Sequence, residues 1–127
     1  MSMTDKELFR MAVEASENAY APFSNFHVGA ALLTEDGKVF TGVNIENSSY
    51  GATICAERTA MVKAISEGAR DFESIAIAGN GGTSWPCGIC RQFMYEFCPE
   101  IRVISGENED ELQVYTLKEL LPEGFKL

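Results

Sequence analysis

Three cysteines of this chain have a spacing that can do chemistry. Cys87 and Cys90 lie three residues apart in the stretch PCGIC, and Cys55 lies upstream in CAER. A C-x-x-C pair by itself is typical of either a redox-active dithiol or half of a metal site. With Cys55 as a third thiolate, the set would be three protein ligands for zinc. The fourth tetrahedral position would then be open to water, as it is in catalytic zinc sites.

Two other residues test this number of ligands. Cys98 follows Cys90 by eight residues, a rise of about 12 Å along a helix. We therefore expect Cys98 to be a small buried residue outside the site. His27 lies within a predicted central strand and is expected to pack there. A structural zinc module needs a fourth protein ligand, so this alternative is disfavoured.

A thiol–disulfide oxidoreductase that uses Cys87 and Cys90 is an alternative from another class. It leaves Cys55 and the charged residues beside it without a role. The thioredoxin pattern also places tryptophan directly before the first cysteine, whereas here Pro86 separates Trp85 from Cys87. We therefore favour zinc, and we expect Trp85 to be incidental to the chemistry.

An acidic residue beside the cysteines can carry protons. Glu57 follows Cys55 at the start of a predicted helix, where both side chains lean toward the helix N-terminus. Zinc lowers the pKa of a bound water, and the hydrolysis that follows needs a proton carrier. The alternative is that Glu57 only complements the helix dipole. Arg58 and Arg91 directly follow site residues and can offset thiolate charge; Arg91 can equally be a solvated surface residue.

The elements that must position these residues follow from periodicity and turn signals. Thr4 to Glu7 is a capping-box pattern that opens a helix over about residues 5–19. Two apolar segments flank the Asp-Gly turn in EDGK and predict a hairpin. A helix starts near Cys55 and closes at Gly68, and a second starts near Cys87 and runs to about Phe97. Further strands are predicted at FESIAIAG, IRVISG and LQVYT, before a last short helix at LKELL.

This order of elements, α-β-β-α-β-α-β-β-α, predicts an α/β fold. We expect a three-layer α-β-α sandwich around a mixed central sheet of about five strands. The 127 residues contain no linker, repeat or low-complexity tract, so residues 1–127 are expected to form a single domain.

Charge narrows the possible partners. The formal net charge is −9, and no basic stripe is present, so polynucleotides and anionic membranes are poor candidates. No apolar run reaches the ~20 residues that span a bilayer, and the N-terminus lacks a signal-peptide pattern. We expect a cytoplasmic protein with reduced cysteines that acts on a small molecule.

The pattern C-A-E followed by P-C-x-x-C matches the zinc deaminase signature, with cysteine in place of histidine. With AYAPFSNFHVGAALL, GVNIENSSYGATICAERTA and ELLPEGF, the chain resembles the small homotetrameric type of cytidine deaminase, within the cytidine and deoxycytidylate deaminase superfamily. The resemblance implies hydrolysis of cytidine, 2′-deoxycytidine or both to the uridine form and ammonia, as in pyrimidine salvage. It also implies one Zn²⁺ per chain and active sites shared between subunits.

The resemblance further assigns residues to roles. The zinc ligands would be Cys55, Cys87 and Cys90. Glu57 would carry protons to N3 of the base and to the leaving ammonia. The substrate-binding residues would be Phe26, Asn44, Glu46, Ala56 and Phe125, of which the last reaches into a neighbouring subunit's site. The ligand thiolates would be stabilised by Arg58 and Gln92.

Two departures from the family pattern concern substrate preference. Ile89 and Phe93 replace residues that are smaller in most relatives, and Ile89 adds bulk beside the zinc loop. Blasticidin S deaminases share the zinc motifs but lack the element NIEN at residues 44–47. Deamination of a modified cytosine nucleoside such as blasticidin S is therefore the alternative reaction.

Overall fold

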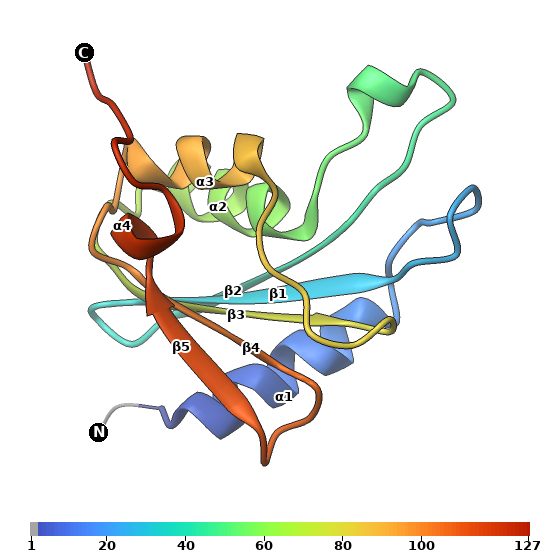
Figure 1. Cartoon of the computed structure of the whole chain (residues 1–127), viewed down its shortest axis with the longest axis horizontal. Helices are drawn as coiled ribbons and strands as arrows, with labels where there is room; N and C mark the ends of the chain where they lie inside the picture. Colours follow the sequence, from blue (N-terminus) through green and yellow to red (C-terminus); the bar gives the residue numbers. More distant parts are fainter. Residues whose placement is uncertain (1–2) are drawn as a thin grey trace.

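A computed structural model describes residues 3–127 and has helices on both faces of one mixed sheet (Figure 1). Helix α1 covers one face, and α2, α3 and the short α4 lie over the other. The predicted three-layer α/β sandwich of five strands is confirmed. The elements are α1 (Asp5–Ser16), β1 (Val28–Thr34), β2 (Val39–Val43), the 3₁₀ turn η1 (Tyr50–Ala52), α2 (Ala56–Ser66), β3 (Phe72–Gly79), α3 (Gly88–Tyr95), β4 (Arg102–Gly106), β5 (Leu112–Thr116) and α4 (Leu117–Leu120).

The strands follow the order β2-β1-β3-β4-β5. Strand β1 pairs antiparallel with both β2 and β3, and β4 pairs antiparallel with β5. Among the five strands named above, β3 and β4 are the one parallel pair, and this pairing needs a crossover connection, which α3 provides. All seven residues of β1 are buried, as expected for a central strand that is apolar on both alternating faces.

The two helical layers pack closely against the β1–β2 hairpin. A Cβ atom on Gly29 would collide with the backbone of α1 at Ala12, and one on Gly42 would collide with the backbone of α2 at Ala56 and Ala60. Glycine therefore allows both helices to approach the sheet. The close approach fixes the height of the start of α2 above the sheet, which matters because that start carries Cys55.

Two helices end earlier than their periodicity predicts. Helix α1 ends at Ser16 rather than near residue 19, because the amides of the next three residues bond to carbonyls three positions back. Such bonds form a 3₁₀-type turn, which is common at helix ends. Helix α3 ends at Tyr95 rather than near Phe97, and the amide of Phe97 likewise bonds to the Met94 carbonyl.

The apolar core has one cluster on each face of the sheet. Alternate side chains of β1 and β3 point to opposite faces, so the same two strands contribute to both clusters. Leu8, Phe9 and Ala12 of α1 belong to the smaller cluster. The larger cluster contains Met61 of α2 and Cys90 and Met94 of α3. Among residues 3–127, no helix has both the length and the apolar character needed to cross a membrane.

Candidate functional site

Three cysteines converge where α2 and α3 begin. Cys55 is the N-cap residue of α2 and Cys87 is the N-cap residue of α3, and both have extended backbone dihedrals. Cys90 lies one turn into α3, on the same face as Cys87. Their Sγ atoms all lie within 4.8 Å of one another. The sequence prediction that two helix starts bring three sulfurs together is confirmed.

The spacing of the sulfurs fits zinc. Two sulfurs about 2.3 Å from one zinc ion at a tetrahedral angle lie about 3.8 Å apart. The Sγ atoms of Cys55 and Cys87 are 3.7 Å apart. Neither cysteine uses its side chain to cap its own helix, so both sulfurs are free to bind a metal.

The surroundings of the sulfurs favour thiolate at Cys55. A hydrogen bond from the Cys90 thiol lowers the pKa of Cys55 to about 5, and the guanidinium of Arg58 acts in the same direction. The same hydrogen bond raises the pKa of Cys90 above its usual range. Nη2 of Arg58 lies 3.7 Å from Cys55 Sγ and 3.4 Å from the Thr53 carbonyl. Arg58 thus lies where charge compensation was predicted.

The other candidate ligands lie outside this cluster. Cys98 is buried, and its thiol donates to the Met94 carbonyl at 3.3 Å. His27 directly precedes β1 instead of lying within it, and it is partly buried. For Arg91 the sequence left two roles open, a partner of the thiolates or a solvated surface residue. Its Nε donates to the Pro86 carbonyl at 2.7 Å and its Nη1 to the Leu120 carbonyl at 2.6 Å, so Arg91 ties α3 to α4.

Glu57 is buried beside the sulfurs, with 4% of its surface exposed. Burial raises the pKa of its carboxyl from 4.5 to about 7, and the negative charge of Cys55 adds to the rise. A dication held by the sulfurs would act against this rise. A buried carboxyl with this surrounding charge is a candidate proton carrier.

A cavity of about 220 Å³ opens next to Cys55, Glu57 and Cys87. Pockets for drug-sized ligands are ~300–1,000 Å³, so this one fits a small ring. Its other lining residues come from the start of β1 and the segment before it, the residue after β2, the start of α2 and the segment before it, β3, and the loop before α3: Phe26, Val28, Asn44, Thr53, Ile54, Ala56, Ile77, Ser84 and Trp85.

Trp85, which we expect to be incidental to the chemistry, is nevertheless part of the cavity wall. Its ring packs edge-on against Tyr115 with centroids 5.1 Å apart. Ile77 and Ser84 were also missed. Ile77 belongs to an apolar strand and cannot be told from a core residue by sequence, whereas Ser84 and Trp85 lie directly before P-C-x-x-C, a signal that could have found them.

The predicted substrate contacts are only partly brought together. Phe26, Asn44 and Ala56 line the cavity, and the Ala56 amide belongs to the first turn of α2, whose N–H groups have no partner within the helix. Glu46 does not line it. The Glu46 carboxylate accepts hydrogen bonds from the amides of Phe23 and Ser24 and from the Ser24 hydroxyl. Its role at a sugar stays a prediction.

Phe125 and Gln92 meet at the C-terminal segment. The Gln92 side chain donates a hydrogen bond to the Phe125 carbonyl at 3.0 Å. This bond goes to the C-terminal segment and not to a ligand cysteine. Phe125 is 63% exposed and lies outside the lining of the cavity. An exposed ring suits a contact with another copy of the chain, but that contact stays a prediction.

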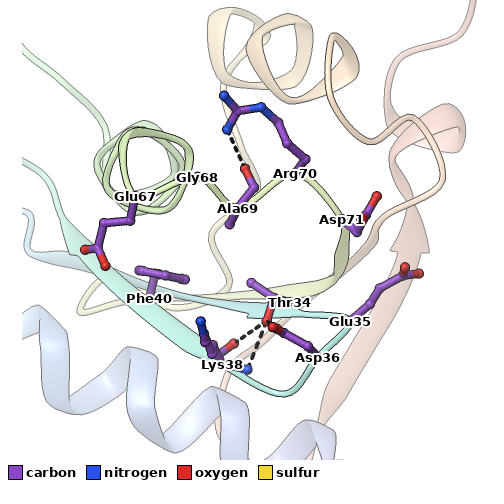
Figure 2. Close-up of a pocket in the computed structure, with 10 residues that line it drawn as sticks. All are labelled: Thr34, Glu35, Asp36, Lys38, Phe40, Glu67, Gly68, Ala69, Arg70 and Asp71. Carbon is purple, nitrogen blue, oxygen red and sulfur yellow. Dashed lines mark hydrogen bonds between the residues drawn. The ribbon is translucent and has the colours of Figure 1, made fainter.

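A larger hollow of about 680 Å³ lies at the other end of α2 (Figure 2). Charged side chains from the β1–β2 turn and from the segment after α2 surround it, among them Asp36, Lys38 and Asp71. Several of its polar groups bond to the protein itself: Thr34 to Asp36, and Arg70 to the Ala69 carbonyl. The three clustered cysteines and Glu57 are absent from its lining, so the smaller cavity is the candidate site.

Known proteins resemble this chain in sequence and in structure. The family model for the cytidine and deoxycytidylate deaminase zinc-binding region matches residues 2–106. A cytidine deaminase of Halalkalibacterium halodurans is 50% identical over 125 residues, covering 97% of this chain and 95% of the relative. A blasticidin-S deaminase of Bacillus cereus is 31% identical over 131 residues, covering 96% and 92%.

The solved structures agree. The crystal structure of cytidine deaminase from Burkholderia pseudomallei matches with a TM-score of 0.91 at 47% identity, covering 97% of this chain and all of that one. The enzyme from Mycobacterium tuberculosis matches with a TM-score of 0.81 at 38% identity, covering 94% and 95%. Likeness of sequence and of fold along nearly the whole chain, together with the cysteine site, shows that the protein belongs to the cytidine and deoxycytidylate deaminase family.

Proposed function

We propose that this protein is a zinc-dependent cytidine deaminase that converts cytidine, 2′-deoxycytidine or both to the uridine form and ammonia. The observation that carries the proposal is the convergence of three cysteine sulfurs with a buried carboxyl, Glu57, at one small cavity. The higher identity to cytidine deaminase than to blasticidin-S deaminase, 50% against 31%, favours cytidine as the substrate.

The residues of the chain can perform this reaction in defined roles. Cys55, Cys87 and Cys90 would hold one Zn²⁺, which when bound lowers the pKa of a water and supplies a nucleophile at neutral pH. Glu57 would take one proton from the attacking water and deliver it to N3 of the base as C4 is attacked. It would then take the remaining proton from the new hydroxyl at C4 and pass it to the amine, which leaves as ammonia while the C4 carbonyl forms. Burial keeps competing solvent away from this carboxyl.

The walls of the cavity hold the substrate. Phe26 provides an apolar face for the pyrimidine ring, and the Ala56 amide is a donor for its polar edge. Asn44 and Glu46 are candidates for the sugar hydroxyls, because an amide and a carboxylate can each make further hydrogen bonds beside those they make within the protein. Arg58 and Gln92 remain candidates for stabilising the thiolates, with Arg58 already 3.7 Å from a sulfur.

The finer features implied by the resemblance belong to the same proposal. Residues 1–127 form one domain, and the protein is a homotetramer whose subunits share active sites through Phe125. It works in pyrimidine salvage in the cytoplasm. Four free cysteines, three of them adjacent in space, support a reducing compartment, and exposed aromatic side chains support association.

Replacing Glu57 with glutamine tests the mechanism. Glu57→Gln keeps the shape and burial of the side chain but removes the proton carrier, so we expect kcat to fall by about 10²–10⁴-fold. Zinc, measured by atomic emission, should stay at about one ion per chain. Turnover is followed by the change in ultraviolet absorbance as cytidine becomes uridine.

A matched control lies at the other end of the same helix. Glu67 is the exposed C-cap residue of α2, so Glu67→Gln should leave kcat and zinc content unchanged. Full activity of Glu57→Gln would contradict the role of Glu57 as the proton carrier. Turnover of blasticidin S without turnover of cytidine would favour the modified nucleoside, and disulfide reduction by a metal-free protein would favour the redox alternative.

A further inference from the structure

Asn80 forms hydrogen bonds with the segment that carries Phe26. It directly follows β3, and its Oδ1 accepts a hydrogen bond from the His27 amide at 2.9 Å. Its Nδ2 donates to the Asn25 carbonyl at 3.1 Å, and its backbone amide donates to the His27 carbonyl at 3.0 Å. These three bonds lie on both sides of Phe26 in sequence, so Asn80 fixes the backbone at the position of that residue.

Asn44 makes the matching contacts from the other side. It follows β2, and its Nδ2 donates to the Phe26 carbonyl at 2.7 Å while its Oδ1 accepts from the Val28 amide at 2.9 Å. Strands β2 and β3 flank β1. Two asparagine side chains therefore continue the hydrogen-bonding ladder on both edges of the segment before β1, where the neighbouring strands have already ended.

The loop after β3 also packs against the Phe26 ring. A Cβ on Gly81 would lie 2.7 Å from Cε1 of Phe26, and a Cβ on Gly79 would lie 3.0 Å from Cζ. The ring thus lies against a backbone that has no side chains at these two positions. Because Asn80 sits between the two glycines, the same three residues hold both the backbone and the ring of Phe26.

The held segment is bent into a rare conformation. Asn25, directly before Phe26, has φ 61°, in the left-handed region that asparagine tolerates better than most residues. A segment with such a turn needs external contacts to keep it in place. The Asn25 carbonyl receives its bond from Asn80, so Asn80 holds the turn that directs Phe26 to the cavity wall.

We propose that Asn80 is a positioning residue that sets the place of the Phe26 ring at the pyrimidine-binding wall, with Gly79 and Gly81 as the surface on which the ring rests. The inference rests on the proposed function, because it assigns specificity for the planar base to this clamp. Asn80 acts through Phe26 and does not itself line the cavity. Loss of the clamp lets the ring move and weakens binding of the base without altering the groups that move protons.

The first test compares Asn80→Ala with wild type. The variant loses two side-chain hydrogen bonds, and we expect KM for cytidine to rise about tenfold while kcat stays within about twofold and zinc content is unchanged. A rise in KM alone is the mark of lost uniform binding. Asn80→Asp retains an acceptor for the His27 amide and should recover part of the loss. Asn108→Ala removes a loop asparagine bonded to Glu111 and should leave KM unchanged.

A double-mutant cycle tells positioning from general loosening. If Asn80 acts through the Phe26 ring, Asn80→Ala should raise KM no further in a Phe26→Ala background. Gly81→Ala displaces the ring while leaving the Asn80 side chain in place, so it should raise KM as well. If Asn80→Ala does not fold, Gly81→Ala still tests whether the place of the Phe26 ring sets KM. An unchanged KM in the folded variants, or additive effects with Phe26→Ala, would overturn the proposal.

Hydrogen exchange separates this proposal from the proposed function. In Asn80→Ala the His27 amide should lose protection by about tenfold, whereas the Val28 amide, held by Asn44, should keep it. If the wild-type protein does not deaminate cytidine, the proposed function fails. The clamp is then judged by exchange and by the affinity for uridine, followed through the fluorescence of Trp85; unchanged exchange at His27 overturns it.

Discussion

Burial separates the reactivity of Cys98 from that of Cys87. Burial raises the pKa of Cys98 from 9.0 to about 12, whereas Cys87 is exposed at the start of α3. At pH 8 this lowers the thiolate fraction of Cys98 about a thousandfold relative to an ordinary thiol. Iodoacetamide should therefore alkylate Cys87 of the zinc-free protein well before Cys98, as read by peptide mass spectrometry.

Unfolding and zinc provide the two controls for this labelling. In urea the Cys98 thiol should react as fast as the others, since its resistance comes from burial. Zinc should protect Cys55, Cys87 and Cys90 and leave Cys98 unchanged. Equal labelling of Cys98 and Cys87 in the folded, zinc-free chain would contradict the burial argument.

The pairing of Cys87 with Cys90, and of Cys55 with Glu57, could be predicted from sequence because spacing at the start of a helix converts directly into geometry. Cys87 and Cys90 lie one helical turn apart wherever the helix is placed. Asn80 and Ile77 could not be predicted in the same way. Their roles depend on which residues the sheet order places beside them, and no local pattern encodes that a loop after β3 will reach the segment before β1.

Among the elements, the starts of α2 and α3 were better predicted than the ends of α1 and α3. A helix that begins at Cys55 or Cys87 is marked by local signals, among them Pro86. A helix end depends on which carbonyl accepts the hydrogen bonds of the next amides. At the ends of α1 and α3 it is the carbonyl three residues back. This pattern follows tertiary contacts: the Tyr20 amide, for example, bonds to the Asn44 carbonyl.

Arg91 links two elements and should contribute to stability. Its guanidinium donates to the carbonyls of Pro86, before α3, and Leu120, at the end of α4. Hydrogen bonds from a charged donor contribute ~1.5–3 kcal/mol. Arg91→Ala should therefore lower the free energy of unfolding by about 2–3 kcal/mol, measured by urea denaturation of the zinc-loaded protein.

Arg70 offers the control for Arg91. Its guanidinium also donates to two carbonyls, those of Ile65 and Ala69, but both are close in sequence and the side chain is exposed. Arg70→Ala should lower the free energy of unfolding by about 0.5 kcal/mol or less, the usual range for an exposed substitution. Equal losses for the two variants would show that the link between α3 and α4 adds nothing.

At the scale of the whole molecule, the single chain leaves several large apolar side chains exposed. Phe23 and Tyr50 are exposed and pack edge-on with centroids 6.2 Å apart, and Ile45 and Phe125 are exposed as well. Exposed apolar surface of this kind marks interaction sites, and in a symmetric oligomer the same surface serves every subunit. The proposed tetramer would cover it, and light scattering measures the mass directly.

Shared active sites make a sharper prediction than mass alone. If Phe125 completes a neighbour's site, Phe125→Ala should lower kcat/KM by about tenfold or more, since burial of an aromatic side chain contributes ~1.5–3 kcal/mol. Glu57→Gln is inactive for a separate reason. Unfolded together and refolded, the two variants form mixed oligomers in which a Glu57→Gln subunit supplies Phe125 to a site that retains Glu57. Activity should then exceed the sum of the separate variants. As a control, refolding Phe125→Ala with the double variant Glu57→Gln/Phe125→Ala should give no gain in activity. If the mixture of Phe125→Ala with Glu57→Gln also gave no gain, each chain would complete its own site.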